Sequence, residues 1–180
     1  MVELDGWTLE PLEADDAPLV AELLTQRGNQ YVLDVPPDEA LIRDAFDAIA
    51  QQPWTLPLVM VRNGGIGGMA TTALVNLKSR SASLIGLFVE PPSASTPLAM
   101  YIRHVFWTFP LHRLYAQIPE MDLTREYIRL LTSVGFVEEG RLPGYAVIGG
   151  QTFDMVPLGL TRDDFEAWAA TNEPRLGLTP

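Results

Sequence analysis

The stretch from Ser81 to Val89 constrains the fold most, because it is almost entirely apolar after Ser83 and is followed by Pro91 and Pro92. A short apolar run without polar alternation is typical of a strand whose two faces are both buried. Proline lacks the amide that strand pairing needs, so the strand must end before these residues. The run therefore predicts a central strand in a sheet that is covered on both faces.

Strands and helices alternate along the rest of the chain. Asn63-Gly64 separates two apolar runs and is a strong signal for a β-hairpin. Strands that follow one another favour antiparallel pairing, and single helices between strands favour parallel crossovers. The predicted fold class is α/β (mixed α+β), with one mixed, mostly antiparallel central sheet and helices on both faces. Strands are expected at 7–12, 58–62, 69–75, 81–89, 114–118, 137–141 and 152–158.

Five helices are predicted from apolar periodicity and capping signals. The third begins with Thr96 as its cap and Pro97 at its first helical position, and the fourth ends at Gly135 with Phe136 behind it. The last opens with a capping box at Thr161. The other two are expected from Asp15 or Asp16 to Arg27 and at 38–50.

Length and composition limit the class of protein. The 180 residues fit one domain, expected at 1–171 with a loose C-terminal tail at 172–180. No apolar run reaches the length of a membrane helix, and the acidic start is unlike a signal peptide. The chain has no cysteine, and His104 and His112 do not have zinc spacing. A cytoplasmic protein without a metal site is expected.

The charge is distributed unevenly. The net charge of −11 argues against binding to nucleic acid. Residues 1–60 carry twelve acidic and two basic side chains, whereas residues 61–120 carry two acidic and five basic ones. The middle third would therefore tolerate an anionic ligand. The alternative explanation is that this third is mostly buried sheet and lacks surface acids for that reason.

Three stretches occur in an order that is more specific than any of them alone: 82–91, 124–140 with a GF…EG sequence at its end, and 150–155. On these residues the sequence from Thr8 to Phe165 resembles the GNAT superfamily of N-acetyltransferases. It looks most like the branch that acetylates the N-terminal amines of ribosomal proteins. The first stretch resembles the family's fourth strand and its exit, the second its GF…EG segment, and the third its last hairpin.

The resemblance implies a reaction and a set of binding residues. An amine attacks the thioester of acetyl-CoA or another acyl-CoA directly, with help from a base and an acid and without a metal. The acceptor is a primary amine of a small molecule or a peptide N-terminus. The implied coenzyme-binding residues are Leu87, Phe88 and Val89 on the fourth strand, Ala94, Ser95, Thr96, Pro97, Leu98 and Ala99 in the diphosphate loop, and Thr124 and Arg129. The implied acceptor-binding residues are Tyr31 and Asp34.

The chain departs from the family pattern in the diphosphate loop. No arginine or glutamine precedes it, and Pro97 replaces the middle glycine, which removes one amide donor. Coenzyme A is therefore expected to bind about tenfold or more weakly than to an ordinary member. Arg125 and Arg129 offer cations nearby, but they can equally pair with acidic side chains on their own helix.

The family's catalytic tyrosine is also missing, because Leu131 stands in its place. Tyr127, one helical turn earlier, is the candidate acid, and Glu90 at the end of the central strand is the candidate base. A packed tyrosine and a solvated carboxylate are the structural alternatives. We expect an N-acyltransferase, with a catalytically degenerate binding or scaffold protein as the alternative. Neither nucleic acid nor a membrane is expected as a partner, and the sequence leaves a homodimer open.

The same resemblance makes a geometric prediction. The central strand and its parallel neighbour are expected to diverge near Leu87 and Ala116 and to open a cleft between them.

Overall fold

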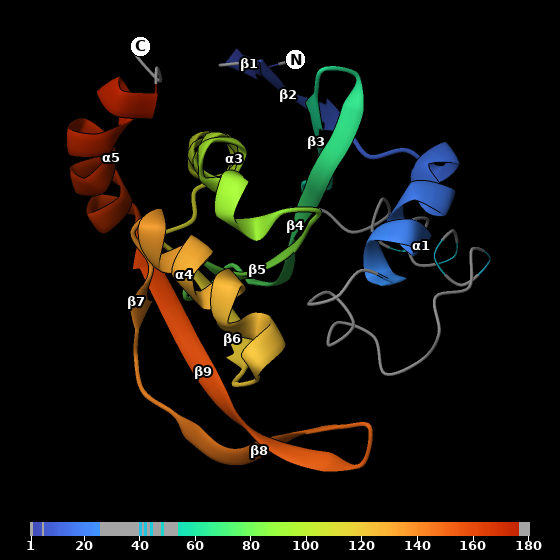
Figure 1. Ribbon diagram of the computed structural model, residues 1–180. Coiled ribbons are helices and arrows are strands. Elements are labelled where there is room, and N and C mark those ends of the chain that lie inside the picture. The colour runs from blue at the N-terminus through green and yellow to red at the C-terminus, as the bar shows by residue number, and fades with distance from the viewer. Residues whose placement is uncertain are drawn as a thin grey trace.

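The computed structural model describes residues 2–4, 6–25, 40, 42, 44, 48 and 54–176. Its centre is one sheet of nine strands in the order β1-β2-β3-β4-β5-β6-β9-β7, with β8 paired to β9 beside this path (Figure 1). All neighbouring strands are antiparallel except β5 and β6, which are parallel. The predicted fold class is confirmed. The strands are β1 (Val2–Leu4), β2 (Trp7–Pro11), β3 (Leu58–Arg62), β4 (Gly65–Asn76), β5 (Ser81–Phe88), β6 (Arg113–Pro119), β7 (Val137–Glu138), β8 (Leu142–Ile148) and β9 (Gln151–Thr161).

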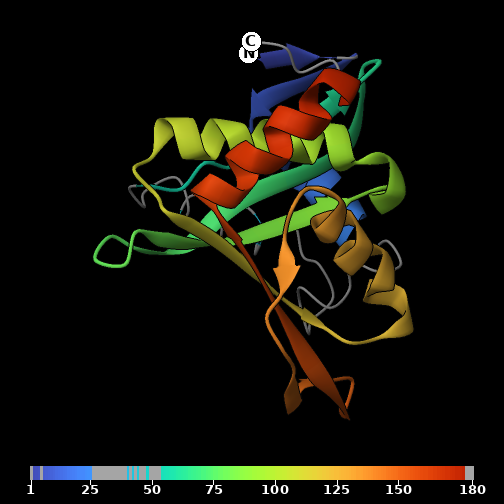
Figure 2. The ribbon, with the colours of Figure 1, turned by 90° about the vertical axis from the view of Figure 1, so that its left-hand side faces the viewer.

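Helices cover both faces of this sheet (Figures 1 and 2). Successive side chains of a strand point to opposite faces. Phe88 of β5 packs in the core formed with α3 (Ser95–Thr108), α4 (Arg125–Ser133) and α5 (Arg162–Leu176), whereas its neighbour Leu87 packs in a second core with α1 (Ala17–Thr25). Burial on both sides explains the apolar run that marks β5 in the sequence. Short 3₁₀ turns precede three of the helices: η1 (Ala14–Asp16), η2 (Pro91–Ser93) and η3 (Asp122–Thr124).

Local sequence signals place several boundaries correctly. Asn63 and Gly64 both have positive φ, 51° and 78°, as the two-residue turn between β3 and β4 requires. At the end of α4 the Phe136 amide donates to the Leu131 carbonyl and the Gly135 amide to the Thr132 carbonyl. These two bonds form a Schellman motif, which needs the positive φ of 99° at Gly135. The predicted hairpin turn at Asn63-Gly64 and the predicted helix end at Gly135 are both confirmed.

The end of the chain also follows a predicted cap. The Asp164 amide donates to the Thr161 hydroxyl at 3.1 Å, which is the N-cap bond of the predicted capping box, and the Thr161 hydroxyl donates to the Asp164 carboxylate at 2.5 Å. The helix then continues through Leu176, so it takes in the first residues of the expected tail. None of the helices in the described part of the chain is long and apolar enough to cross a membrane.

Other predicted boundaries are wrong. Residues 142–148, which were not predicted as a strand, form β8 and pair with β9 in place of residues 137–141. Only Val137–Glu138 of the strand expected at 137–141 is paired. The third helix begins at Ser95 and has Ala94, not Thr96, as its cap, because η2 delivers the chain directly into its first turn. β1 was not predicted, and β4 starts four residues early, at Gly65. Most of the helix expected at 38–50 lies outside the described residues.

Candidate active site

The central feature of the site is the separation of β5 from β6. Their parallel pairing runs only from Ser81 with Arg113 to Ser83 with Tyr115. Beyond this point β5 stays paired with β4 up to Phe88, and β6 stays paired with β9. The two strands are pulled apart by different partners, so the predicted divergence is confirmed.

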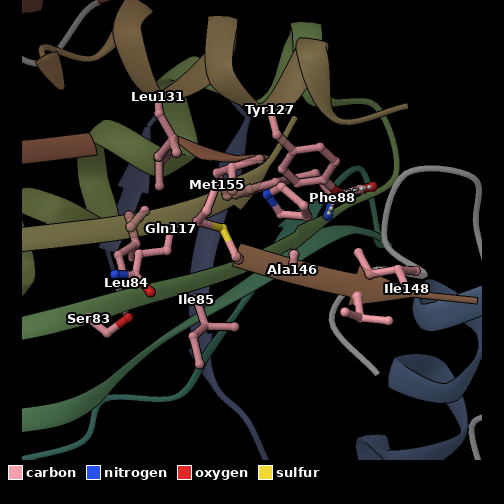
Figure 3. Close-up of a pocket in the computed structure, with 16 residues that line it drawn as sticks. Ser83, Leu84, Ile85, Phe88, Gln117, Tyr127, Leu131, Ala146, Ile148 and Met155 are labelled. Atoms are coloured by element: carbon pink, nitrogen blue, oxygen red, sulfur yellow. Dashed lines mark hydrogen bonds between the residues drawn. The ribbon is translucent and has the colours of Figure 1, made fainter. Parts of the chain in front are cut away.

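A pocket of about 410 Å³ lies in the gap (Figure 3). Its volume falls in the range of small-molecule sites. The described residues that line it include no charged side chain, so it suits an uncharged ligand segment better than a phosphate. They come from β5 (Ser83, Leu84, Ile85, Gly86, Phe88), α3 (Leu98), β6 (Ala116, Gln117, Ile118, Pro119), α4 (Tyr127, Leu131) and the β8–β9 hairpin (Ala146, Val147, Ile148, Met155).

The backbone of β5 faces this gap with hydrogen-bonding groups. The Val89 amide donates to the Gly67 carbonyl on the β4 side, at 3.0 Å. Because alternate residues direct their amides and carbonyls to opposite neighbours, those of Gly86 and Phe88 point to the β6 side. At the level of Gly86 and Phe88, β6 is no longer paired with β5. A ligand with amide groups that lay in the gap would therefore meet the amide and carbonyl of Gly86 on this strand edge.

Tyr127 reaches this edge from α4. The Phe88 amide donates to the Tyr127 hydroxyl at 3.1 Å, and the hydroxyl lies 3.4 Å from the Phe88 carbonyl oxygen, to which it can donate. The two rings are 5.8 Å apart. Tyr127 is only 3% exposed, and burial raises the pKa of its phenol to about 12, while the bond to Phe88 lowers this pKa to a smaller extent. The phenol is therefore protonated at neutral pH and acts as a donor.

Glycine makes room for the Phe88 ring. A Cβ at Gly86 would lie 2.8 Å from a ring carbon of Phe88, and a Cβ at Gly68 would also lie 2.8 Å from that ring. These distances are shorter than a Cβ contact allows, so only glycine fits at position 86 of β5 and at position 68 of β4. The ring position, and with it the contact to Tyr127, depends on both glycines.

The N-terminus of α3 forms the other end of the cleft. The amides of Ser93 and Ala94 donate to the carbonyls of Glu90 and Pro91 and are thereby used within η2. The next amides, of Ser95 and Thr96, lie in the first helical turn, where the helix itself offers no acceptor. The third residue of that turn is Pro97, which has no amide. The predicted loss of a donor in the diphosphate loop is thus located in the first turn of the helix.

The remaining loop residues act mainly in packing. Ala94, Pro97, Leu98 and Ala99 are buried, and only Leu98 among them lines the pocket. On β5, Leu87 points into the core with α1, and Val89 is 41% exposed beyond the end of the strand.

Glu90 is not brought together with Tyr127 in the pocket. It is exposed after the end of β5 and lines two neighbouring hollows. One of these, of about 460 Å³, is also lined by Glu126. The structure thus places the two predicted catalytic residues in different cavities, both adjacent to the end of β5.

The residues expected to contact coenzyme from α4 have other surroundings. Thr124 is fully buried. Its hydroxyl accepts from the Met121 amide at 3.1 Å and donates to the Pro119 carbonyl. Arg129 is exposed and does not line the pocket, and Arg125 pairs with Asp122 at 3.1 Å. Tyr31 and Asp34 lie outside the described residues.

The pocket also has walls that sequence reasoning missed. Met155, Ala146 and Ile148 close it from the β8–β9 hairpin (Figure 3). The strand signal in this hairpin is the apolar run of residues 145–148, which follows Gly144 directly. The part of the chain that the structure describes contains no group of three or more His, Asp or Glu residues placed to hold a metal ion.

Comparison with models of protein families gives no match, and a search of curated proteins finds none with significant similarity. Solved structures do match. The spermidine N-acetyltransferase from Vibrio cholerae, in complex with CoA and spermine, gives a TM-score of 0.77 at 19% identity, covering 89% of this chain and 98% of that one. The chain has the GNAT fold. A protein of T. thermophilus assigned as an acetyltransferase gives a TM-score of 0.75 at 20% identity and covers 97% of this chain and 95% of that one.

Structural neighbours of the chain are thus GNAT-fold acetyltransferases. The resemblance seen in the sequence is confirmed at the level of the fold. The narrower likeness to the branch that modifies ribosomal proteins stays a prediction.

Proposed function

We propose that the protein is an N-acyltransferase that moves an acetyl or other acyl group from coenzyme A to a primary amine. The observation that carries this proposal is the opened β5 edge beside an uncharged pocket of about 410 Å³. An elongated arm with amide groups and an apolar acyl end fits such a slot. The fold is the one found in an enzyme solved with CoA.

The two parts of coenzyme A fit this chain unequally. The cleft-facing amide and carbonyl of Gly86 would hold the pantetheine arm, and the Phe88 amide would have to exchange its bond to Tyr127 for one to the arm. The diphosphate would meet the amides and hydroxyls of Ser95 and Thr96 at the N-terminus of α3, where the helix dipole favours negative charge. Pro97 gives no donor there. The arm therefore supplies most of the binding.

Acyl-coenzyme A, when bound, supplies an activated thioester carbon, which forms the new C–N bond as the C–S bond breaks. Glu90 takes the proton that the attacking amine must lose, directly or through water. The Tyr127 hydroxyl donates a hydrogen bond to the sulfur as negative charge develops on it. Because a thiol has a pKa of about 8.5 and the phenol one of about 12, complete proton transfer is uphill, and water delivers the final proton.

The acceptor in this proposal is a cationic amine. Glu90 and Glu126 line the hollow beside the end of β5, and the N-terminal third of the chain is strongly acidic. Opposite charge raises the local concentration of a cationic substrate. The neighbour from Vibrio cholerae is a spermidine N-acetyltransferase, which favours a small polyamine over a peptide N-terminus as the first acceptor to test.

Thermal unfolding with acetyl-CoA and longer acyl-CoAs tests binding, and release of the free thiol in the presence of spermidine or an N-terminal peptide tests turnover. A ligand at 100 times its dissociation constant adds about 2.7 kcal/mol to the free energy of unfolding. We expect stabilisation by at least one acyl-CoA and thiol release that depends on the amine. No stabilisation by any acyl-CoA at millimolar concentration would overturn the proposal.

One observation favours the alternative of a binding protein. The Tyr127 hydroxyl already holds the Phe88 amide, the group that a bound arm needs at the reacting end. Stabilisation by acyl-CoA without thiol release for any amine would support this alternative.

A further inference from the structure

Two neighbouring cavities at the end of β5 differ in charge. The described residues that line the pocket between β5 and β6 are all uncharged. The hollow of about 460 Å³ beside it is lined by η2 and by the carboxylates of Glu90 and Glu126. Both glutamates are exposed, and the salt bridges of the described residues include neither of them. Within this part of the chain, the negative charge of the hollow is therefore not neutralised by an ion pair.

The hollow continues the pocket toward α3. Phe88 and Tyr127 line the pocket (Figure 3), and the residues next to them in the chain, Val89 and Glu126, line the hollow. The turn η2, which forms another wall of the hollow, leads directly into the first turn of α3. A bound molecule that extends from the pocket to α3 therefore passes the two carboxylates.

The first turn of α3 offers few groups to a phosphate. The amides and hydroxyls of Ser95 and Thr96 can donate to one phosphate group, and Pro97 adds no amide for a second one. A second phosphate would also bring more negative charge close to the carboxylates of the hollow. Exposed charges interact over about 8 Å at physiological ionic strength, so this repulsion is not fully screened. The site therefore suits a ligand with a single phosphate better than one with several.

The next step rests on the proposed function. We propose that the site recognises its acyl donor by the phosphopantetheine arm alone, so that an acylated arm attached to a serine of a carrier protein serves at least as well as acyl-CoA. Such an arm has the amides and the thioester of the coenzyme but only one phosphate. Coenzyme A has a diphosphate and a further phosphate on its ribose. The cleft binds what the two acyl donors share, and the carboxylates disfavour what only the coenzyme has.

The surface around the hollow leaves room for a carrier. Pro92 and Ser93 of η2 are exposed, as is Glu90 before them, so a polypeptide joined to the phosphate stays outside the cleft. The group transfer itself is unchanged. The C–N bond forms at the acyl carbon as the C–S bond breaks, Glu90 or water takes the amine proton, and the thiolate left on the arm is protonated by water.

Three molecules with the same acetylated arm test the proposal: acetyl-phosphopantetheine, an uncharged peptide whose serine carries this arm, and acetyl-CoA. Calorimetry measures their affinities, and release of the free thiol in the presence of spermidine measures transfer. We expect the first two to bind at least as tightly as acetyl-CoA, and the peptide-borne arm to reach at least an equal kcat/KM.

The outcomes separate this proposal from the proposed function. Tenfold or tighter binding of acetyl-CoA than of acetyl-phosphopantetheine, or transfer from acetyl-CoA but not from the peptide-borne arm, would overturn recognition by the arm alone and leave an N-acyltransferase. Absence of binding by all three molecules would overturn both.

Glu126→Gln tests the cause of the preference. The change removes one negative charge from the hollow, so we expect the affinity for acetyl-CoA to rise about threefold. The affinity for acetyl-pantetheine, which has no phosphate, should stay the same. Glu166→Gln makes the same change at an exposed residue of α5 that lines neither the pocket nor the hollow, and it should alter neither affinity. Equal effects of the two variants on acetyl-CoA would overturn repulsion by the hollow as the basis of the preference.

Discussion

The two ends of the cleft lie close together in the sequence but differ in what they offer a ligand. Next to β5, the open strand edge, the apolar pocket and the protonated phenol of Tyr127 are in place. At the N-terminus of α3, two amides remain, a third is replaced by Pro97, and no cation stands in the loop. The cleft is created by the divergence of β5 and β6 and the packing of α4, which do not depend on the loop. A chain with this fold can therefore keep the cleft between β5 and β6 while it loses amide donors at the N-terminus of α3.

The largest expected effect tests the β5 end. Tyr127→Phe keeps the ring and removes the donor to the leaving sulfur, so we expect turnover to fall about a hundredfold. The Phe88 amide also loses its acceptor, which costs about 1 kcal/mol in the free energy of unfolding. Steady-state kinetics and chemical denaturation measure the two effects separately.

Tyr101→Phe is the matched control for this variant. The Tyr101 hydroxyl donates to the Leu56 carbonyl at 2.8 Å, and the residue is fully buried on α3 without lining the pocket. It should lose similar stability with turnover unchanged. Full turnover in Tyr127→Phe would show that the β5 end takes no part in the chemistry.

A smaller effect concerns the protonation of the same phenol. The pKa of Tyr127 is raised to about 12 in the folded chain, against about 10 when unfolded. Between these values the unfolded chain loses the proton and the folded chain keeps it. The contribution of this phenol to the free energy of unfolding is therefore complete below pH 10. It falls by on the order of 2 kcal/mol as the pH rises to about 12. Denaturation of Tyr127→Phe should show a shallower decline, and equal slopes would contradict the buried state of the phenol.

The smallest effect tests the α3 end. Pro97→Ala restores an amide in the first turn of the helix, where it can donate to a phosphate. We expect the affinity for acetyl-CoA, measured by calorimetry, to rise about tenfold, or about 1.4 kcal/mol. The affinity for acetyl-pantetheine, which lacks the diphosphate, should not change.

Pro92→Ala makes the same substitution at an exposed residue of η2, before the helix begins, and should leave both affinities unchanged. If Pro97→Ala strengthened the binding of both ligands equally, the difference between the two ends would not lie in the missing amide.

The sequence was informative where a boundary depends on neighbouring residues. The apolar run before Pro91 marks β5, Asn63-Gly64 marks the β3–β4 turn, and Gly135-Phe136 marks the end of α4. Each of these is a local requirement of the backbone. The divergence of β5 and β6 was also predicted, but from resemblance to a family and not from the residues alone.

Prediction failed where the outcome depends on distant partners. Pro143 and Gly144 are turn residues by local criteria, yet β9 pairs with this segment and makes it a strand. Tyr127 was placed near the cleft, but its bond to Phe88 follows from how α4 packs on β5. Glu90 lies two residues after the end of β5, just before η2, and lines a separate hollow from Tyr127.

The close packing of the Phe88 ring against Gly68 and Gly86 has a consequence for the evolution of this protein. A substitution at Gly86 is excluded only while a bulky ring occupies position 88, whereas a Cβ at Gly68 would in addition lie 2.7 Å from the backbone carbonyl oxygen of Leu87. Positions 86 and 88 should therefore change together among descendants of a common ancestor, while position 68 stays glycine: a glycine at 86 with an aromatic residue at 88, or a larger residue at 86 with a small one at 88. In the second kind of descendant position 127 would lose its ring contact and would keep only the bond between its hydroxyl and the backbone of position 88.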